Sequence, residues 1–125
     1  GHNLKEQLNQ AYAHAEMIAI QKAAEVKGNW CLNDCDLYVT LEPCMMCTGI
    51  INLSRIRTVY YGTIDPKGGC LETVIDLKKI NRLNHYPNIV GNILQKECSE
   101  ILTNYFRKKR ETTKEKKQKN KANIQ

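Results

Sequence analysis

One short segment, Leu41–Cys47, constrains this chain more than any other part of its sequence. It reads Leu-Glu-Pro-Cys-Met-Met-Cys, and Cys44 and Cys47 can provide two thiolate ligands to a metal. His14 can provide an imidazole, and three protein ligands with one open position are typical of a catalytic rather than a structural zinc. Glu16 is then left beside the metal without ligating it, where a carboxylate can act as an acid–base group.

Each half of this pattern has a simpler interpretation when it is taken alone. A histidine at the start of a helix need not bind anything, and a lone C-x-x-C pair also occurs in redox proteins and zinc ribbons. A His-x-Glu segment upstream of Pro-Cys-x-x-Cys is more specific, because it is the signature of zinc-dependent nucleobase deaminases. Together, His14, Glu16, Cys44 and Cys47 therefore favour a catalytic zinc.

The sequence around the two cysteines predicts a strand followed by a helix. Residues 36–41 are mostly apolar and β-branched, which indicates a strand. Pro43 suits the beginning of a helix, because it has a fixed φ and no N–H to leave unpaired. Cys44 and Cys47 would then face the same way on the first helical turn, where the positive helix end favours thiolates.

The upstream half of the site is predicted to lie at the start of another helix. Residues 13–26 are rich in good helix formers. His14 and Glu16 are two residues apart, so they would point in different directions on a regular helix. Both can approach one metal only if His14 lies at the irregular start of that helix.

The rest of the chain predicts a second strand, parallel to the first and joined to it by a right-handed helical crossover. The polar residues at the N-terminus indicate a loop, and residues beyond Thr112 are expected to be disordered. The remaining expected elements are a strand at 57–63, a short or broken helix at 74–83, a short strand at 88–90 and a last helix from about residue 94.

A length of 125 residues indicates one domain, with no apolar run long enough to span a membrane and no secretory signal. Without an export signal, we expect reduced thiols in the cytoplasm. Cys31 and Cys35 could form a second metal pair, but no further ligands follow nearby, so we interpret them as ordinary small residues. The four cysteines outside the metal motif, with no disulfide-framework spacing, are Cys31, Cys35, Cys70 and Cys98.

Positive charge is concentrated at the end of the chain. Residues 107–125 hold nine Lys or Arg and two Asp or Glu, a net +7, whereas the whole chain carries +6 and residues 1–106 therefore about −1. We predict a domain at 1–106 and a basic extension at 107–125. Such an extension can bind a polyanion or can be a solubilising tail, and charge alone does not separate the two.

Several segments together resemble the bacterial tRNA-specific adenosine deaminases, over residues 1 to about 110. The zinc motif alone resembles the wider cytidine-deaminase-like superfamily, and the other segments resemble the tRNA enzymes within it. The resemblance implies a three-layer α/β/α fold with a mixed five-stranded sheet, a homodimer, and conversion of the wobble adenosine of a tRNA anticodon to inosine. The segments that carry the resemblance are His14–Glu16, Pro43–Cys47, Asn52–Arg57, Leu83–His85, Glu97-Cys98 and Tyr105–Arg110.

The resemblance also implies roles for single residues. His14, Cys44 and Cys47 resemble the zinc ligands, Glu16 the proton shuttle and Asn3 the asparagine that holds the purine. Further RNA contacts are expected at Asp65, Lys67, Asn84, His85, Phe106, Arg107, Lys108 and Arg110. Phe106 can stack on a base, although a place in the core is an equal expectation.

The chain departs from the family at its beginning, and two other functions stay open. Family members carry a helix and a β-hairpin before the segment that resembles Gly1–Asn3. The same zinc chemistry could deaminate a free base or nucleotide, of cytosine or guanine type, although a small substrate needs no basic extension. An inactive RNA-binding zinc fold is the other alternative, but it would have no use for Glu16 beside the metal.

Overall fold

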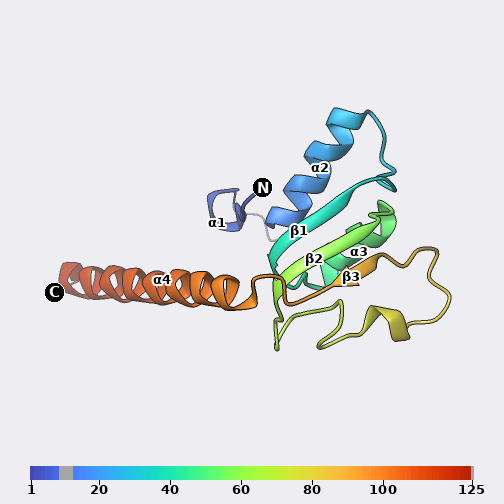
Figure 1. Cartoon of the computed structure of the whole chain (residues 1–125). Helices are drawn as coiled ribbons and strands as arrows, with labels where there is room; N and C mark the ends of the chain where they lie inside the picture. The colour runs from blue at the N-terminus through green and yellow to red at the C-terminus, as the bar shows by residue number, and fades with distance from the viewer. Residues whose placement is uncertain (9–12, 125) are drawn as a thin grey trace.

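The computed structural model describes residues 1–8 and 13–124 of the chain. Helices and strands alternate along most of its length, as expected for an α/β fold (Figure 1). The elements are α1 (Lys5–Leu8), α2 (Ala15–Lys27), β1 (Asp36–Leu41), α3 (Met45–Leu53), β2 (Thr58–Thr63), the 3-10 helix η1 (Leu77–Lys79), β3 (Asn88–Val90) and α4 (Gln95–Ile124).

The sheet contains three strands in the order β1-β2-β3, and both neighbouring pairs are parallel. Val59 of β2 lies opposite Leu37 of β1 on one side and Ile89 of β3 on the other. Parallel strands cannot be joined by a tight turn, and α3 provides the crossover between β1 and β2. The predicted strand at 36–41 and its parallel pairing with the next strand are confirmed.

The hydrophobic core lies on one face of the sheet, beneath α2 and α3. Strand side chains alternate between faces, and Leu37, Val59 and Tyr61 share the face that meets Ile20 of α2 and Ile51 of α3. Loop residues complete this core, so the long connections of the chain are part of the packing. The whole buried cluster is Ile20, Leu32, Leu37, Ile51, Ile56, Val59, Tyr61, Leu71 and Leu77.

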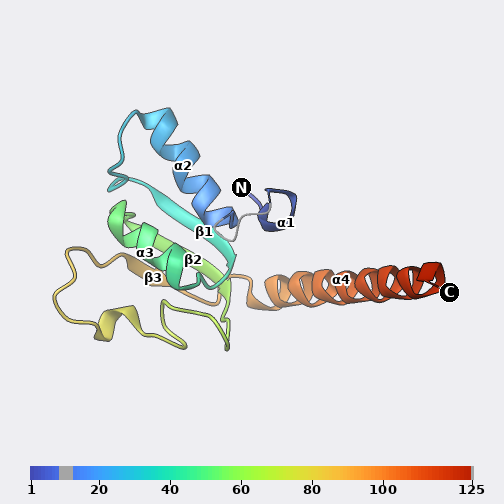
Figure 2. The ribbon, with the colours of Figure 1, turned by 180° about the vertical axis from the view of Figure 1, so that it is seen from behind.

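The opposite face of the sheet is largely open in the described part of the chain. Tyr38 is 70% exposed and stacks on Tyr60, with ring centroids 4.6 Å apart and ring planes at 10°. The first turns of α4 approach this face at Gly62, where any larger side chain would overlap the sulfur of Cys98. α4 then projects away from the sheet (Figures 1 and 2).

The expected α/β class is confirmed, but residues 1–8 and 13–124 form a parallel sheet with two layers instead of a mixed sheet with three. α4 does not supply a full layer, because beyond Phe106 its sequence is dominated by charged residues that prefer water.

The expectation of disorder beyond Thr112 is wrong, because α4 continues to Ile124. From Gln95 to Ile124 the chain contains no Gly or Pro, and its many Lys, Glu and Gln residues are good helix formers. No helix of the described residues is long and apolar enough to cross a membrane.

Two other predictions changed locally. The helix expected at 74–83 is reduced to η1, where Asp76 accepts a hydrogen bond from the Lys78 N–H at 3.1 Å. The N-terminal loop contains the short helix α1. There the Asn3 Oδ1 atom accepts a hydrogen bond from the Lys5 N–H at 2.8 Å, as helix-capping asparagines do.

Candidate metal centre and adjoining cavity

The two cysteines lie where β1 gives way to α3. Cys44 is the N-cap residue of α3, with φ −76° and ψ 179°, and its carbonyl accepts the first helical hydrogen bond from Thr48 at 2.9 Å. α3 therefore begins at Met45, two residues beyond Pro43. Cys47 lies on the first turn and is fully buried, so both sulfurs stand at a helix N-terminus, which favours negative charge.

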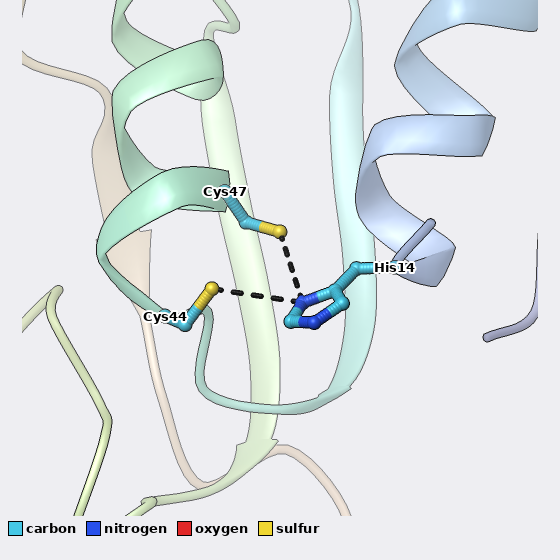
Figure 3. Close-up of side chains that lie close together, drawn as sticks. All are labelled: His14, Cys44 and Cys47. Carbon is cyan, nitrogen blue, oxygen red and sulfur yellow. Dashed lines mark hydrogen bonds between the residues drawn. The ribbon is translucent and has the colours of Figure 1, made fainter. Parts of the chain in front are cut away.

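His14 meets these cysteines from the start of the neighbouring helix. It is the N-cap residue of α2, with φ −77° and ψ 154°, which confirms the predicted irregular start of that helix. Its Nδ1 atom lies 3.6 Å from the sulfur of Cys44 and 3.6 Å from that of Cys47 (Figure 3). The extended N-cap backbone lets His14 and Glu16 approach the same point although they are only two residues apart.

The geometry of the three side chains fits a tetrahedral zinc. Their ligand atoms all lie within 4.8 Å of one another. Zn–S bonds near 2.3 Å and Zn–N bonds near 2.0–2.1 Å in a tetrahedron place sulfur and nitrogen about 3.6 Å apart, which matches both distances to Nδ1. Within the described ranges no other group of this kind is found.

Glu16 lies beside this cluster on the first turn of α2. Its Oε2 atom is 3.7 Å from the Cys47 sulfur. Burial raises the pKa of the Cys47 thiol, and the neighbouring Glu16 and Cys44 raise it further. A bound cation reverses this effect, because a coordinating thiol is deprotonated outright. The donor set of two thiols and an imidazole thus fits a zinc ion, which would stabilise the thiolate form.

A cavity of about 970 Å³ adjoins the cluster and brings together segments far apart in the sequence. Its walls come from the N-terminus, the start of α2, the end of β1 and one face of α4. Of the predicted site residues, those that line it are Asn3, His14, Glu16, Cys44, Asp65 and Phe106. Residues in its wall that were not predicted as site residues include Tyr38, Thr40, Tyr105 and Lys109.

Tyr105 and Lys109 were not predicted as site residues, although they lie close to Phe106 on α4. Tyr105, Phe106 and Lys109 share one face of α4, because residues three and four apart are neighbours on a helix. The sequence predicts this helix, so its spacing could have indicated Lys109 once Phe106 was chosen. The sequence could not indicate that this face of α4 would line the same cavity as β1.

Asp65 shapes the loop in which it lies. Its Oδ1 atom accepts hydrogen bonds from the N–H groups of Lys67 and Gly68, both at 3.1 Å, which is typical of a turn-forming aspartate. The Lys67 side chain is exposed and is not part of the cavity wall. Asp65 therefore has a structural role in addition to its place in the wall.

Asn84 and His85 are not brought to the cavity. The His85 Nε2 atom lies 2.6 Å from the carbonyl oxygen of Ile56, and Asn52 donates a hydrogen bond to the His85 carbonyl. These contacts hold the 83–86 turn against the C-terminal end of α3, whereas Cys44 marks its N-terminal end. RNA contacts at Asn84 and His85 remain predictions. Both residues lie away from the metal cluster, at the other end of α3.

Several basic residues of α4 are exposed along the projecting helix, among them Arg107, Lys108, Arg110, Lys114 and Lys117. Phe106 is exposed and packs edge-on against Tyr105, with ring centroids 5.4 Å apart, so it is not a core residue. Arg107 donates to the Asn104 side chain at 3.2 Å, and Lys108 is exposed without lining the cavity. Phe106 and Arg110 border a smaller hollow of about 410 Å³ along the helix.

Comparison with known proteins identifies the family. The family described as MafB19-like deaminase matches residues 1–110. The tRNA-specific adenosine deaminase of Bacillus subtilis (strain 168) is 44% identical over 113 residues, which are 90% of this chain and 70% of that protein. The chain belongs to the tRNA-specific adenosine deaminase family. The resemblance stated from the sequence motifs is thus confirmed.

Solved structures agree with this membership. A structure from a study of A-to-I editing by tRNA:A34 deaminases at the wobble position of transfer RNA has a TM-score of 0.75 and 40% identity, and the match covers 81% of this chain and 73% of that one. A guanine deaminase from Nitrosomonas europaea has a TM-score of 0.66 and 19% identity, covering 84% of this chain and 63% of that one. The second likeness shows a shared cytidine-deaminase-like fold alone.

We predict that Cys44→Ala abolishes tight metal binding and lowers the free energy of unfolding, because ligand binding is coupled to folding in such sites. Elemental analysis and thermal unfolding measure the two effects. Cys31→Ala, which removes a thiol outside the cluster, is the matched control and should leave both unchanged. Full metal content in Cys44→Ala would show that the ligands are assigned incorrectly.

Proposed function

We propose that this deaminase converts adenosine to inosine at the wobble position of a tRNA anticodon, by hydrolysis at a site holding one zinc ion. The observation that carries the proposal is the cluster of His14, Cys44 and Cys47 with Glu16 beside it, opening into a large cavity. Membership of the tRNA-specific adenosine deaminase family supports the choice of reaction.

The three ligand side chains would hold the zinc and leave one position open. Bound there, the ion supplies Lewis-acid chemistry, since coordination to zinc can lower the pKa of water to about 7. His14 and Cys44 are half-buried and Cys47 is buried, so the protein shields the ligands while leaving access from the cavity. Such an open site is what hydrolysis requires.

Glu16 is the group that moves protons in this proposal. Its carboxylate accepts a proton from the attacking water as the water oxygen adds to C6, and delivers that proton to N1 of the adenine ring. Glu16 then takes the proton of the new C6 hydroxyl and passes it to the exocyclic amine, so that the C–N bond breaks, the C6 carbonyl forms, ammonia leaves and inosine remains. One carboxylate can serve these steps, because it is beside the cluster without belonging to the ligand set.

Asn3 and the α4 face are proposed to hold the substrate. Asn3 lines the cavity, and its Nδ2 group would donate to N7 of a purine while Oδ1 caps α1. Tyr105 and Phe106 offer aromatic surfaces on which unstacked bases can lie. An anticodon loop suits this arrangement, because its bases leave the stack at lower cost than those of a duplex.

The two alternatives have less support. A free base would need neither the α4 wall of the cavity nor the basic residues beyond it, and the likeness to a guanine deaminase is one of fold. An RNA-binding protein without activity would gain nothing from Glu16 at 3.7 Å from the Cys47 sulfur.

Assembly and location follow from the same proposal. We expect a homodimer, and exposed apolar side chains of α3 support it, because Met45, Met46 and Leu53 would be covered in such a contact. We expect the protein in the cytoplasm, because its proposed substrate is tRNA.

The decisive experiment compares matched anticodon stem-loops that carry A or C at the wobble position. Zinc-loaded protein should convert A to inosine and leave C unchanged. Free adenosine, cytidine and guanine are tested in parallel as comparison substrates. Ready deamination of a free base together with an untouched stem-loop would favour the free-base alternative.

Glu16→Ala should keep its zinc and its fold but lose activity on the A stem-loop. General acid–base groups contribute about 10²–10⁴-fold, and a residue that serves several proton transfers is expected near the upper end. Single-turnover rates and zinc content are the measurements. Glu25→Ala, an exposed glutamate on the same helix, should behave like the parent. Activity of Glu16→Ala within about tenfold of the parent would assign proton transfer to another group.

The beginning of the basic extension should contribute to RNA affinity more than its end. Each phosphate contact with single-stranded RNA steepens the dependence of log K on log salt by about 0.7, so Arg107→Gln with Arg110→Gln should make the slope shallower by up to about 1.4. The matched variant Lys114→Gln with Lys117→Gln should change it less, with turnover at saturating RNA similar in both. Equal slopes in the parent and both variants would make the extension a solubilising segment.

A further inference from the structure

Glu42 carries a buried carboxylate that the proposed chemistry does not use. It follows the last residue of β1 and is only 2% exposed. A buried carboxylate is costly unless hydrogen bonds or opposite charges compensate for the lost water. The structure contains such compensation, and all of it comes from one loop.

Five donors of the 65–73 loop converge on this carboxylate. Oε2 accepts hydrogen bonds from the backbone N–H groups of Leu71, Glu72 and Thr73, at 3.1, 2.9 and 3.2 Å. Oε1 accepts one from the Thr73 hydroxyl at 2.6 Å and one from the Asp65 N–H at 3.3 Å. Successive N–H groups pointing at one anion form a concave site like those that bind phosphate.

The backbone near Glu42 is tied to the same loop. The Cys70 N–H donates to the carbonyl of Pro43 at 2.9 Å, and the Glu42 N–H donates to the carbonyl of Thr63 at 2.9 Å. Gly69 allows the close approach, because a larger side chain there would overlap the Glu42 carboxylate.

Glu42 satisfies the part of the loop backbone that the turns of the loop do not satisfy themselves. Residues 64–76 contain neither helix nor strand, so their N–H groups lack the partners that regular structure supplies. Glu42 provides acceptors for four of those N–H groups. An apolar side chain of similar size could fill the space, but it would leave these N–H groups without their acceptor, and that of Leu71 is buried.

We propose that Glu42 is a positioning residue of the active site. It fixes the 65–73 loop, and with it Asp65 in the cavity wall, relative to the zinc ligand Cys44 two residues further along. The claim that Glu42 holds the loop is supported by the hydrogen bonds alone. The claim that it affects substrate binding rests on the proposed function. Glu42 also lines the cavity, but none of these hydrogen bonds reaches the metal cluster, so it acts through the loop.

Glu42→Gln is the informative substitution, because it keeps the shape and turns an acceptor oxygen into a donor that faces N–H groups. Losing one hydrogen bond to a charged group corresponds to about a tenfold change in an equilibrium constant. We expect exchange of the Leu71, Glu72 and Thr73 amides to accelerate about tenfold or more, and KM for the A stem-loop to rise about tenfold. Zinc content and kcat should stay close to those of the parent.

Thr73→Val tests the same contact from the other side, by removing only the hydroxyl donor. It should raise KM less than Glu42→Gln does, and Thr73→Ser should restore the parent value. In the double variant, KM should rise by less than the product of the two single effects, because both act on one cluster. Thr73→Val also keeps the proposal testable if Glu42→Gln does not fold. Glu25→Gln is the charge-matched control and should leave KM unchanged.

The amide exchange is measured by NMR on the full zinc-loaded chain, so its outcome does not depend on activity. If the parent does not deaminate the stem-loop, the proposed function fails, and exchange at residues 71–73 alone decides whether Glu42 holds the loop. Unchanged exchange in Glu42→Gln would overturn the proposal. Accelerated exchange with unchanged KM, or fully independent effects of Glu42→Gln and Thr73→Val, would overturn the positioning role.

Discussion

The parallel pairing of β1 with β2 determines where a site can form in this protein. A parallel pair requires a crossover, so α3 must run back over the sheet and begin at the C-terminal edge of β1. α2 leads into the beginning of β1, and its own N-terminus therefore lies at the same edge. Two helix N-termini meet there, and each carries ligand residues at its first positions: His14 on one, Cys44 and Cys47 on the other.

This arrangement explains why one imidazole and one thiol of the candidate ligand set lie on N-cap positions, with the second thiol on the first helical turn. N-cap residues have extended backbone, so His14 and Cys44 project toward each other instead of along their helices. The positive ends of both helices favour anionic sulfur, which lowers the cost of placing thiolates in a partly buried site. The loop held by Glu42 then borders the same edge, so one region of the sheet combines the candidate metal ligands, the proposed proton shuttle and a wall of the cavity.

The sequence predicted the parts of this structure that depend on local pattern. β1 matches its predicted residues, and His14 lies at the irregular helix start that the spacing to Glu16 required. The prediction failed where distant contacts decide. The 74–83 segment has apolar residues at helical spacing, but the loop before it is held by Glu42, thirty residues away, and only η1 forms. The helical end of α4 was also missed, because its many charged residues suggested a disordered segment.

The position of β1 at the edge of the described sheet has a consequence for solubility. β1 pairs with β2 on one side, and the N–H and C=O groups of its other side have no strand partner in the described part of the chain. Such an edge can add a strand from another molecule, which is how sheets aggregate. Like charge opposes this encounter, and the chain carries +6, with +7 on residues 107–125. At about 0.1 M ionic strength the charges act over only about 10 Å. The colloidal behaviour of the protein is therefore expected to depend on salt, with dilute buffer keeping the exposed edges of different molecules apart.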